Sequence, residues 1–130
     1  MAMDDKNNQI FTKQEREKLC KKYLREIKKC FKTLDAEMLK LNENLMDDCA
    51  HYAVVLKEMN LMIDRDGFQE KYQNGENQWG IKKTVAAELK PKYTQIYQGL
   101  IKQLIGLLPT ESEKSAATEL MEFLQNDKLG

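Results

Sequence analysis

The chain has 130 residues, of which 42% are hydrophobic and 32% are charged, and its 21 basic and 21 acidic side chains cancel. This length suits a single helical domain, residues 1–130, and no apolar run approaches the ~18 residues of a membrane span. The start, MAMDDKNNQI, lacks the apolar region of a signal peptide, so we expect a cytoplasmic protein with no membrane partner.

Charge is distributed unevenly along the chain. Residues 1–33 hold ten basic and five acidic side chains, whereas residues 34–130 hold eleven and sixteen. This asymmetry predicts an anionic partner for the N-terminal part.

A long basic helix is predicted within residues 1–34. The capping-box pattern Thr12-Lys-Gln-Glu15 marks its start, and the apolar residues that follow recur on one face. Seven basic residues fall within an arc of roughly 120° on the opposite face: Lys18, Lys21, Lys22, Arg25, Lys28, Lys29 and Lys32. This basic stripe is either a solvated lysine face or a track for DNA phosphates, which demand clustered positive charge but no base-specific geometry.

A second helix is predicted from an N-cap at Asp35 to the stretch between Asp64 and Gly67. Its apolar positions recur at steps of three and four residues: Met38, Leu41, Leu45, Cys49, Tyr52, Leu56, Met59 and Ile63. This spacing is close to a heptad repeat and predicts packing against a partner helix. Its other face carries acidic residues: Glu37, Glu43, Asp47, Asp48 and Glu58.

The stretch from Asp64 to Lys83 is the longest break in the helical pattern, and it holds the only tryptophan, Trp79. The dipeptide Asn74-Gly75 favours a type I′ turn, so we predict a short β-hairpin or loop. Because a two-stranded ribbon alone is barely stable in water, we expect it to lie on the helices or on another subunit.

A third helix is predicted from Thr84 to Leu108, either kinked by Pro91 or restarted there. A second capping box, Thr110-Glu-Ser-Glu113, precedes a short helix in the tail, residues 109–130. The second and third helices, residues 35–108, should pair as an antiparallel hairpin with the break at its tip. The predicted fold is therefore all-α, with a long basic N-terminal helix, a helical hairpin carrying a β-hairpin or loop at its tip, and a short C-terminal helix.

No catalytic or metal-binding pattern stands out in the sequence. His51 is the only histidine, which leaves no His-based metal cluster and no Ser-His-Asp or Cys-His arrangement. The three cysteines, Cys20, Cys30 and Cys49, lack C-x-x-C spacing, and we expect free thiols packed in the core. There is no P-loop and no dinucleotide-binding pattern, so we predict that the chain is not an enzyme and binds no cofactor.

The segment from about residue 35 to residue 108 resembles the small subunit of bacteriophage terminases. A helix of the type LNENLMDDCAHYAVVLKEM precedes a short apolar run, LMI, and the loop YQNGENQWGIKK, which is similar to that family's loop. A helix of the type AAELKPKYTQIYQGLIKQLIGLLP follows, and TESEKSAATEL is similar to the polar helical tail often found next. Pro91 and an N-terminal part without a clear helix-turn-helix depart from the family's pattern.

The resemblance implies a non-catalytic component of a DNA-packaging motor that forms a ring-shaped homo-oligomer, binds double-stranded viral DNA and recruits or regulates the large terminase subunit. The candidate DNA-binding residues are the basic stripe together with Lys71, Lys82 and Lys83. The candidate subunit contacts are Leu45, Cys49, Tyr52, Leu56, Trp79, Tyr93, Tyr97, Leu100 and Leu104. The alternative is a helical protein-interaction adaptor with no nucleic-acid role, such as a phage morphogenesis factor, in which the basic stripe meets the acidic part of a neighbouring subunit.

Overall fold

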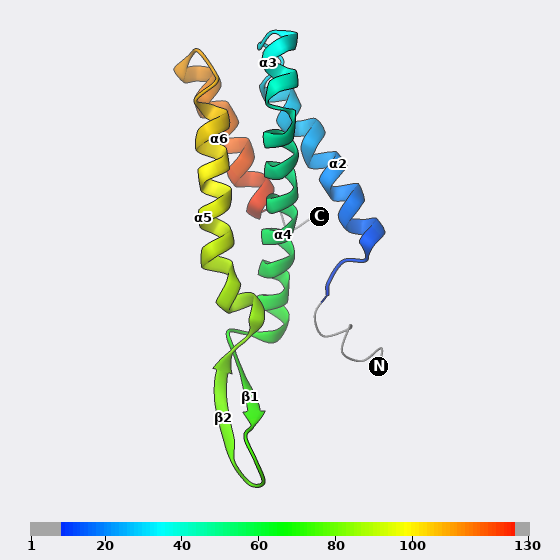
Figure 1. Cartoon of the computed structure of the whole chain (residues 1–130), viewed down its shortest axis with the longest axis vertical. Coiled ribbons are helices and arrows are strands. Elements are labelled where there is room, and N and C mark those ends of the chain that lie inside the picture. Colours follow the sequence, from blue (N-terminus) through cyan, green and yellow to red (C-terminus); the bar gives the residue numbers. More distant parts are fainter. Residues whose placement is uncertain (1–8, 127–130) are drawn as a thin grey trace.

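A computed structural model describes residues 9–126, which form five helices and one β-hairpin (Figure 1). In chain order these are α2 (Lys13–Cys30), α3 (Ala36–Leu41), α4 (Glu43–Asp66), β1 (Gln69–Gln73), β2 (Trp79–Lys83), α5 (Val85–Ile105) and α6 (Glu111–Asn126). This arrangement confirms the predicted all-α fold, with a β-hairpin at the tip of a helical hairpin and a short C-terminal helix.

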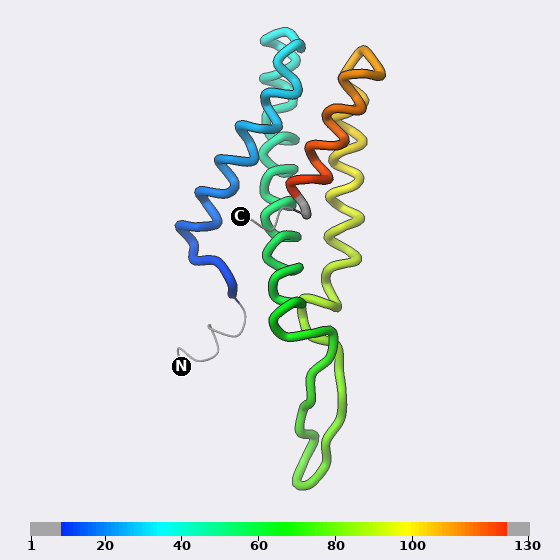
Figure 2. Tube along the Cα trace, turned by 180° about the vertical axis from the view of Figure 1, so that it is seen from behind, coloured from blue at the N-terminus to red at the C-terminus, as the bar shows by residue number. Residues whose placement is uncertain are grey.

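Helix α4 is the centre of the fold. Helices α2, α4 and α5 lie side by side in one layer, and α6 covers the back of that layer, where it contacts all three (Figure 1, Figure 2). The core draws side chains from all four helices: Tyr23, Ile27, Cys49, Val54, Leu56, Tyr97, Leu104 and Met121. Burial raises the pKa of Tyr97, and its hydroxyl donates a 2.8 Å hydrogen bond to the backbone carbonyl of Met121. The buried hydroxyl of Tyr97 thus has a hydrogen-bond partner.

The predicted second helix is in fact two helices, α3 and α4, which are separated at Asn42. Asp35 is the N-cap as predicted, because its carboxylate accepts a 2.8 Å hydrogen bond from the backbone amide of Met38. Asn42 leaves helical geometry, with φ −107° and ψ 13°, while its side-chain amide donates a 2.9 Å bond to the carbonyl of Met38. The backbone amide of Asn42 donates to the same carbonyl at 3.1 Å, so the side chain and the helix ladder share this acceptor. Leu41, just before the break, is 72% exposed and drops out of the apolar seam.

The β-hairpin is present as predicted, but its turn is different. Gln73 pairs with Trp79, so five residues join the strands and the predicted type I′ turn at Asn74-Gly75 is wrong. Positive φ angles fall instead at Gly75 (103°) and Asn77 (66°), residue types that tolerate this region. Both views show the hairpin projecting beyond the ends of α4 and α5 (Figure 1, Figure 2). It does not lie on the helices that the structure describes.

The last two helices follow their capping signals. Thr84 caps α5, which continues through Pro91 without restarting, and Figure 1 shows a bend in its first turns. Before α6, the hydroxyl of Thr110 accepts a 3.1 Å hydrogen bond from the backbone amide of Glu113, which is one half of the predicted capping box. The carboxylate of Glu113 accepts a 3.0 Å bond from the hydroxyl of Thr33, which ties α6 to the segment after α2.

Candidate nucleic-acid interface

The basic stripe lies on α2, and a complete capping box fixes the start of this helix. The hydroxyl of Thr12 accepts a hydrogen bond from the backbone amide of Glu15 at 3.1 Å, and the Glu15 carboxylate accepts one from the Thr12 amide at 2.8 Å. The inner side of α2 buries Leu19, Tyr23 and Ile27 within the helical body. With these three turned inward, the charged residues between them point to solvent.

All seven basic side chains of the stripe are exposed, and Lys32 lies just past the end of α2: Lys18, Lys21, Lys22, Arg25, Lys28, Lys29 and Lys32. Glu26 offsets part of this charge, because its carboxylate lies 3.5 Å from Nζ of Lys29. The pair is exposed, with 70% of the lysine side chain accessible, so salt screens it and it contributes little. The stripe therefore keeps most of its positive charge.

The stripe continues onto α3 through Lys40, a residue that the periodicity of α2 alone does not reveal. An open groove of about 420 Å³ lies between the end of α2 and the α3–α4 corner. It is lined by three lysines, one acid and three apolar residues: Lys28, Lys32, Lys40, Glu43, Ala36, Leu39 and Met46. Three amines around one hollow extend the positive potential of the stripe beyond the helix end.

A partly buried ion pair holds the first turn of α2 against α4. The guanidinium of Arg16 donates to Glu58 through Nε at 2.8 Å and through Nη2 at 3.1 Å. The same carboxylate accepts hydrogen bonds from the backbone amides of Ile10 at 2.8 Å and Phe11 at 2.9 Å. Burial opposes the charged form, but the hydrogen bonds from Arg16 and the two amides outweigh it and lower the pKa of Glu58.

The sequence pattern had placed Glu58 on the outer, acidic face of its helix, and the structure corrects this. Glu58 is 8% exposed and faces the segment that precedes α2. Its partner Arg16 lies 42 residues earlier in the chain, so no local spacing signals the pair. The consequence for the site is that α2 is held in a fixed position at its N-terminal end.

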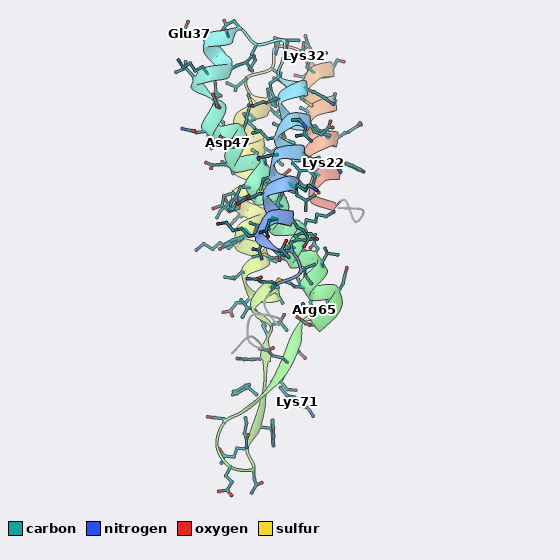
Figure 3. The ribbon with its side chains drawn as sticks, turned by 90° about the vertical axis from the view of Figure 1, so that its right-hand side faces the viewer. Lys22, Lys32, Glu37, Asp47, Arg65 and Lys71 are labelled. Atoms are coloured by element: carbon teal, nitrogen blue, oxygen red, sulfur yellow. The ribbon has the colours of Figure 1, made fainter. Side chains whose placement is uncertain are left out.

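The three lysines of the β-hairpin form a second basic group, distant from the stripe. All three are exposed, and Lys71 is labelled on the projecting hairpin in Figure 3, well away from Lys22 and Lys32 on α2. Lys82 is partly neutralised, since its Nζ lies 3.6 Å from the carboxylate of Glu70. The predicted DNA-binding residues thus fall into two separate surfaces rather than one.

The predicted subunit contacts divide by burial. Cys49, Leu56, Tyr97 and Leu104 are fully covered within one chain, so the heptad seam is explained by intrachain packing and these four are removed as candidates. Leu45, Tyr52, Tyr93 and Leu100 are partly buried and pack on the same core, where the rings of Tyr52 and Tyr93 meet edge to face at 5.8 Å. Trp79 is 65% exposed and stays available to a partner.

Within the described part of the chain, no group of three or more His, Cys, Asp or Glu side chains is placed to hold a metal ion. Burial raises the pKa of all three free cysteines, to about 12 for Cys49. No helix among the described residues is long and apolar enough to cross a membrane.

Comparison with known proteins identifies no relative of this chain. A scan against protein-family models finds no match, and searches of curated proteins and of solved structures find none either. The basic stripe and the β-hairpin are therefore interpreted from their own chemistry.

Proposed function

We propose that this chain is the small subunit of a phage-type terminase, a non-catalytic component that binds double-stranded viral DNA, assembles as a ring and recruits or regulates the large subunit. The observation that carries the proposal is the basic stripe, whose seven basic side chains are all exposed, six of them on α2 and the seventh, Lys32, just past its end. The resemblance of residues 35–108 to that family supplies the biological setting.

The dimensions of the stripe suit a DNA backbone. From Lys18 to Lys29 the helix advances about 16 Å at about 1.5 Å per residue, which is close to the rise of five base pairs at about 3.4 Å each. Lys32 and Lys40 extend the positive surface past the helix end. Side chains of this type contact phosphates, so they would position the duplex without reading its sequence.

Exposed apolar side chains near the hairpin root support subunit contacts. Phe68 is 70% exposed and Val85 is 61% exposed. The carbonyl of Phe68 accepts a hydrogen bond from the amide of Thr84, the residue before Val85, so the two apolar residues lie on adjoining stretches of chain. Apolar side chains gathered at one end of a molecule are typical of an interaction site. We assign this pair to the contact between subunits of the ring. It replaces Cys49, Leu56, Tyr97 and Leu104, which are buried in the core of a single chain.

The competing function, a protein-interaction adaptor, has one observation in its favour. In Figure 3 the acidic residues Glu37 and Asp47 lie on the opposite side from Lys22 and Lys32. Two complementary surfaces on opposite sides of one subunit would join neighbouring copies head to tail, with no nucleic acid involved. A measurement of DNA binding distinguishes the two functions. In the adaptor, the basic stripe contacts the neighbouring subunit and is not available to DNA.

The test compares DNA binding by the wild-type chain and by a variant with Lys21, Lys22, Arg25 and Lys28 all changed to Gln. Fluorescence anisotropy with a labelled duplex should show at least about tenfold weaker binding at low salt. A control with Lys92 and Lys102 changed to Gln removes exposed charge from α5 and should bind as the wild type does. Unchanged affinity in the stripe variant would remove α2 from the DNA contact.

The ring is tested separately by native mass spectrometry. Changing Phe68 and Val85 to Ser should shift the assembly to smaller species, because it removes the apolar pair at the hairpin root. Leu41→Ser is the matched control, since Leu41 is equally exposed but lies on α3, away from the hairpin. An intact ring in the double variant would contradict the assigned contact.

A further inference from the structure

The two faces of the β-hairpin differ in chemistry. Successive side chains of a strand point to opposite faces, so the pairing register assigns each residue to one of them. One face holds the pairs Gln69–Lys83, Lys71–Ile81 and Gln73–Trp79, and the other holds Glu70–Lys82 and Tyr72–Gly80. We call the first the lysine–tryptophan face and the second the tyrosine face.

The tyrosine face is satisfied by contacts within the hairpin. The ring of Tyr72 lies over Gly80, where an added Cβ would come within 2.7 Å of the ring. The Nζ of Lys82 lies 3.6 Å from the carboxylate of Glu70 and 5.7 Å from the centre of the Tyr72 ring. The charge of Lys82 and the ring of Tyr72 are therefore partly covered by contacts within the hairpin, without a binding partner.

The lysine–tryptophan face is open and carries no acid. Its six side chains are two glutamines, two lysines, one isoleucine and one tryptophan, and Trp79 and Ile81 are 65% and 64% exposed. The only acid in either strand, Glu70, lies on the tyrosine face, and Glu76 lies in the connecting loop. The hairpin projects from the helical body, and none of the helices between residues 9 and 126 lies against it in either view (Figure 1, Figure 2).

We propose that the lysine–tryptophan face enters the major groove of duplex DNA and reads base edges there. This inference rests on the proposed function, in which the chain binds duplex DNA through α2. The major groove admits a two-stranded ribbon, and such a ribbon presents one face to the base edges. An acid-free face that projects from the body is suited to this position, because it meets no repulsion from the phosphates on either side.

The spacing of side chains on β1 supports base reading. Gln69, Lys71 and Gln73 occupy alternate positions, about 6.6 Å apart at about 3.3 Å per residue, which is close to two base-pair steps of about 3.4 Å. Glutamine bonds the adenine edge in bidentate fashion, and lysine bonds guanine O6 and N7. On the facing strand, Ile81 and Trp79 supply apolar surface for thymine methyl groups.

The division of labour with the basic stripe follows from these residue types. The stripe of α2 contains only lysine and arginine and binds phosphates of any sequence. The lysine–tryptophan face adds amides and apolar groups, which discriminate between bases. Trp79, predicted from the sequence as a subunit contact, is thereby assigned to DNA.

The single tryptophan of the chain makes the proposal directly testable. The full-length protein is titrated with duplex DNA while the accessibility of Trp79 to acrylamide is followed by fluorescence quenching. We expect DNA to protect Trp79, and we expect protection to disappear in Lys71→Gln/Lys83→Gln. The control Glu70→Gln/Lys82→Gln alters only the tyrosine face and leaves net charge unchanged, so protection should persist.

Sequence preference is the second readout. Selection from a random duplex library should yield a preferred site for the wild type, and Gln69→Ala/Gln73→Ala should lower the ratio of specific to non-specific affinity about tenfold or more. The salt dependence of non-specific binding should not change in this variant, because α2 is intact. A preferred site that survives in the variant would overturn the proposal.

The outcomes separate the two proposals. DNA binding that depends on α2 but leaves Trp79 accessible overturns base reading alone. Protection of Trp79 that rises with protein concentration and does not respond to DNA assigns the face to a second copy and also overturns it. No binding to any duplex at low salt overturns both the proposed function and this inference.

Discussion

Replacement of Glu58 by Gln tests how firmly the basic helix is held to the body. The carboxylate accepts four hydrogen bonds, two from Arg16 and one each from the amides of Ile10 and Phe11. Glutamine keeps one acceptor oxygen but loses the charge and turns an amide nitrogen toward a donor. Breaking a buried ion pair costs about 3–5 kcal/mol, but the Arg16 side chain is 33% exposed and can be resolvated. We therefore expect a loss of about 2 kcal/mol in the free energy of unfolding.

The assay is thermal and urea unfolding of both proteins between pH 3 and pH 7. At pH 7, a loss of this size corresponds to a melting temperature lower by about 6–10 °C for a chain of this length. The folded-state pKa of Glu58 is lowered, so its contribution is complete above the unfolded pKa of about 4.3 and is lost as pH falls through the folded value. The difference between wild type and variant should therefore shrink below about pH 4.

A matched control uses the exposed arginine–carboxylate contact at the end of α4. Nη2 of Arg65 lies 2.7 Å from the carboxylate of Asp66, but both side chains are more than one-third accessible, so Asp66→Asn should change stability much less. A Glu58→Gln difference below about 0.5 kcal/mol, or one that does not vary with pH, would refute the account of this ion pair.

Three further predictions address the core and the hairpin. Tyr97→Phe removes the hydrogen bond to Met121 and should cost about 1 kcal/mol in urea unfolding, and an unchanged midpoint would show that the bond contributes nothing. Gly80→Ala forces the Tyr72 ring off the strand, so amide exchange in the hairpin should accelerate while the melting temperature of the helical body stays constant; slow exchange would contradict the packing of that ring. Cys49, buried and with its pKa raised to about 12, should react with a thiol reagent at pH 8 far more slowly than the two half-buried thiols of α2, and equal rates would contradict its burial.

Local sequence signals predict the helices and their ends well. The capping residues Thr12, Asp35 and Thr110 all accept the expected backbone hydrogen bonds. Each bond links residues three apart, so a short sequence pattern is enough to predict it. The pairing of α4 with α5 follows from two long apolar stripes on either side of a loop. The break at Asn42 is not foreseen, because the apolar pattern continues through it and no proline or glycine marks it.

The candidate site is predicted only in part, because some of its contacts are remote in sequence. Helical periodicity places the basic stripe outward, and the structure agrees. The same periodicity places Glu58 on an outer face, because it contains no information about Arg16, Ile10 and Phe11, which are remote in sequence and cover Glu58 in the fold. Lys40 joins the stripe only through the packing of α3 beside the end of α2.

The strand register of the hairpin is another feature that the sequence does not predict. The Asn-Gly dipeptide predicts a turn, but a two-residue turn would pair different residues and place the β2 side chains on the opposite face. Only the observed pairing of Gln73 with Trp79 sets the acid-free face apart from the tyrosine face. Strand alternation separates the β1 side chains that we assign to base reading from Glu70, but only the register places Trp79 and Ile81 beside them.

The salt dependence of duplex DNA binding tests the central claim, that α2 is a phosphate track. Each phosphate contact contributes about −0.9 to the slope of log affinity against log salt, so contact by six of the basic side chains predicts a slope of about −5. Changing Lys21, Lys22, Arg25 and Lys28 to Gln should make that slope shallower by about 3 to 4. The same slope in both proteins would contradict the claim, as would a wild-type chain that does not bind duplex DNA at low salt.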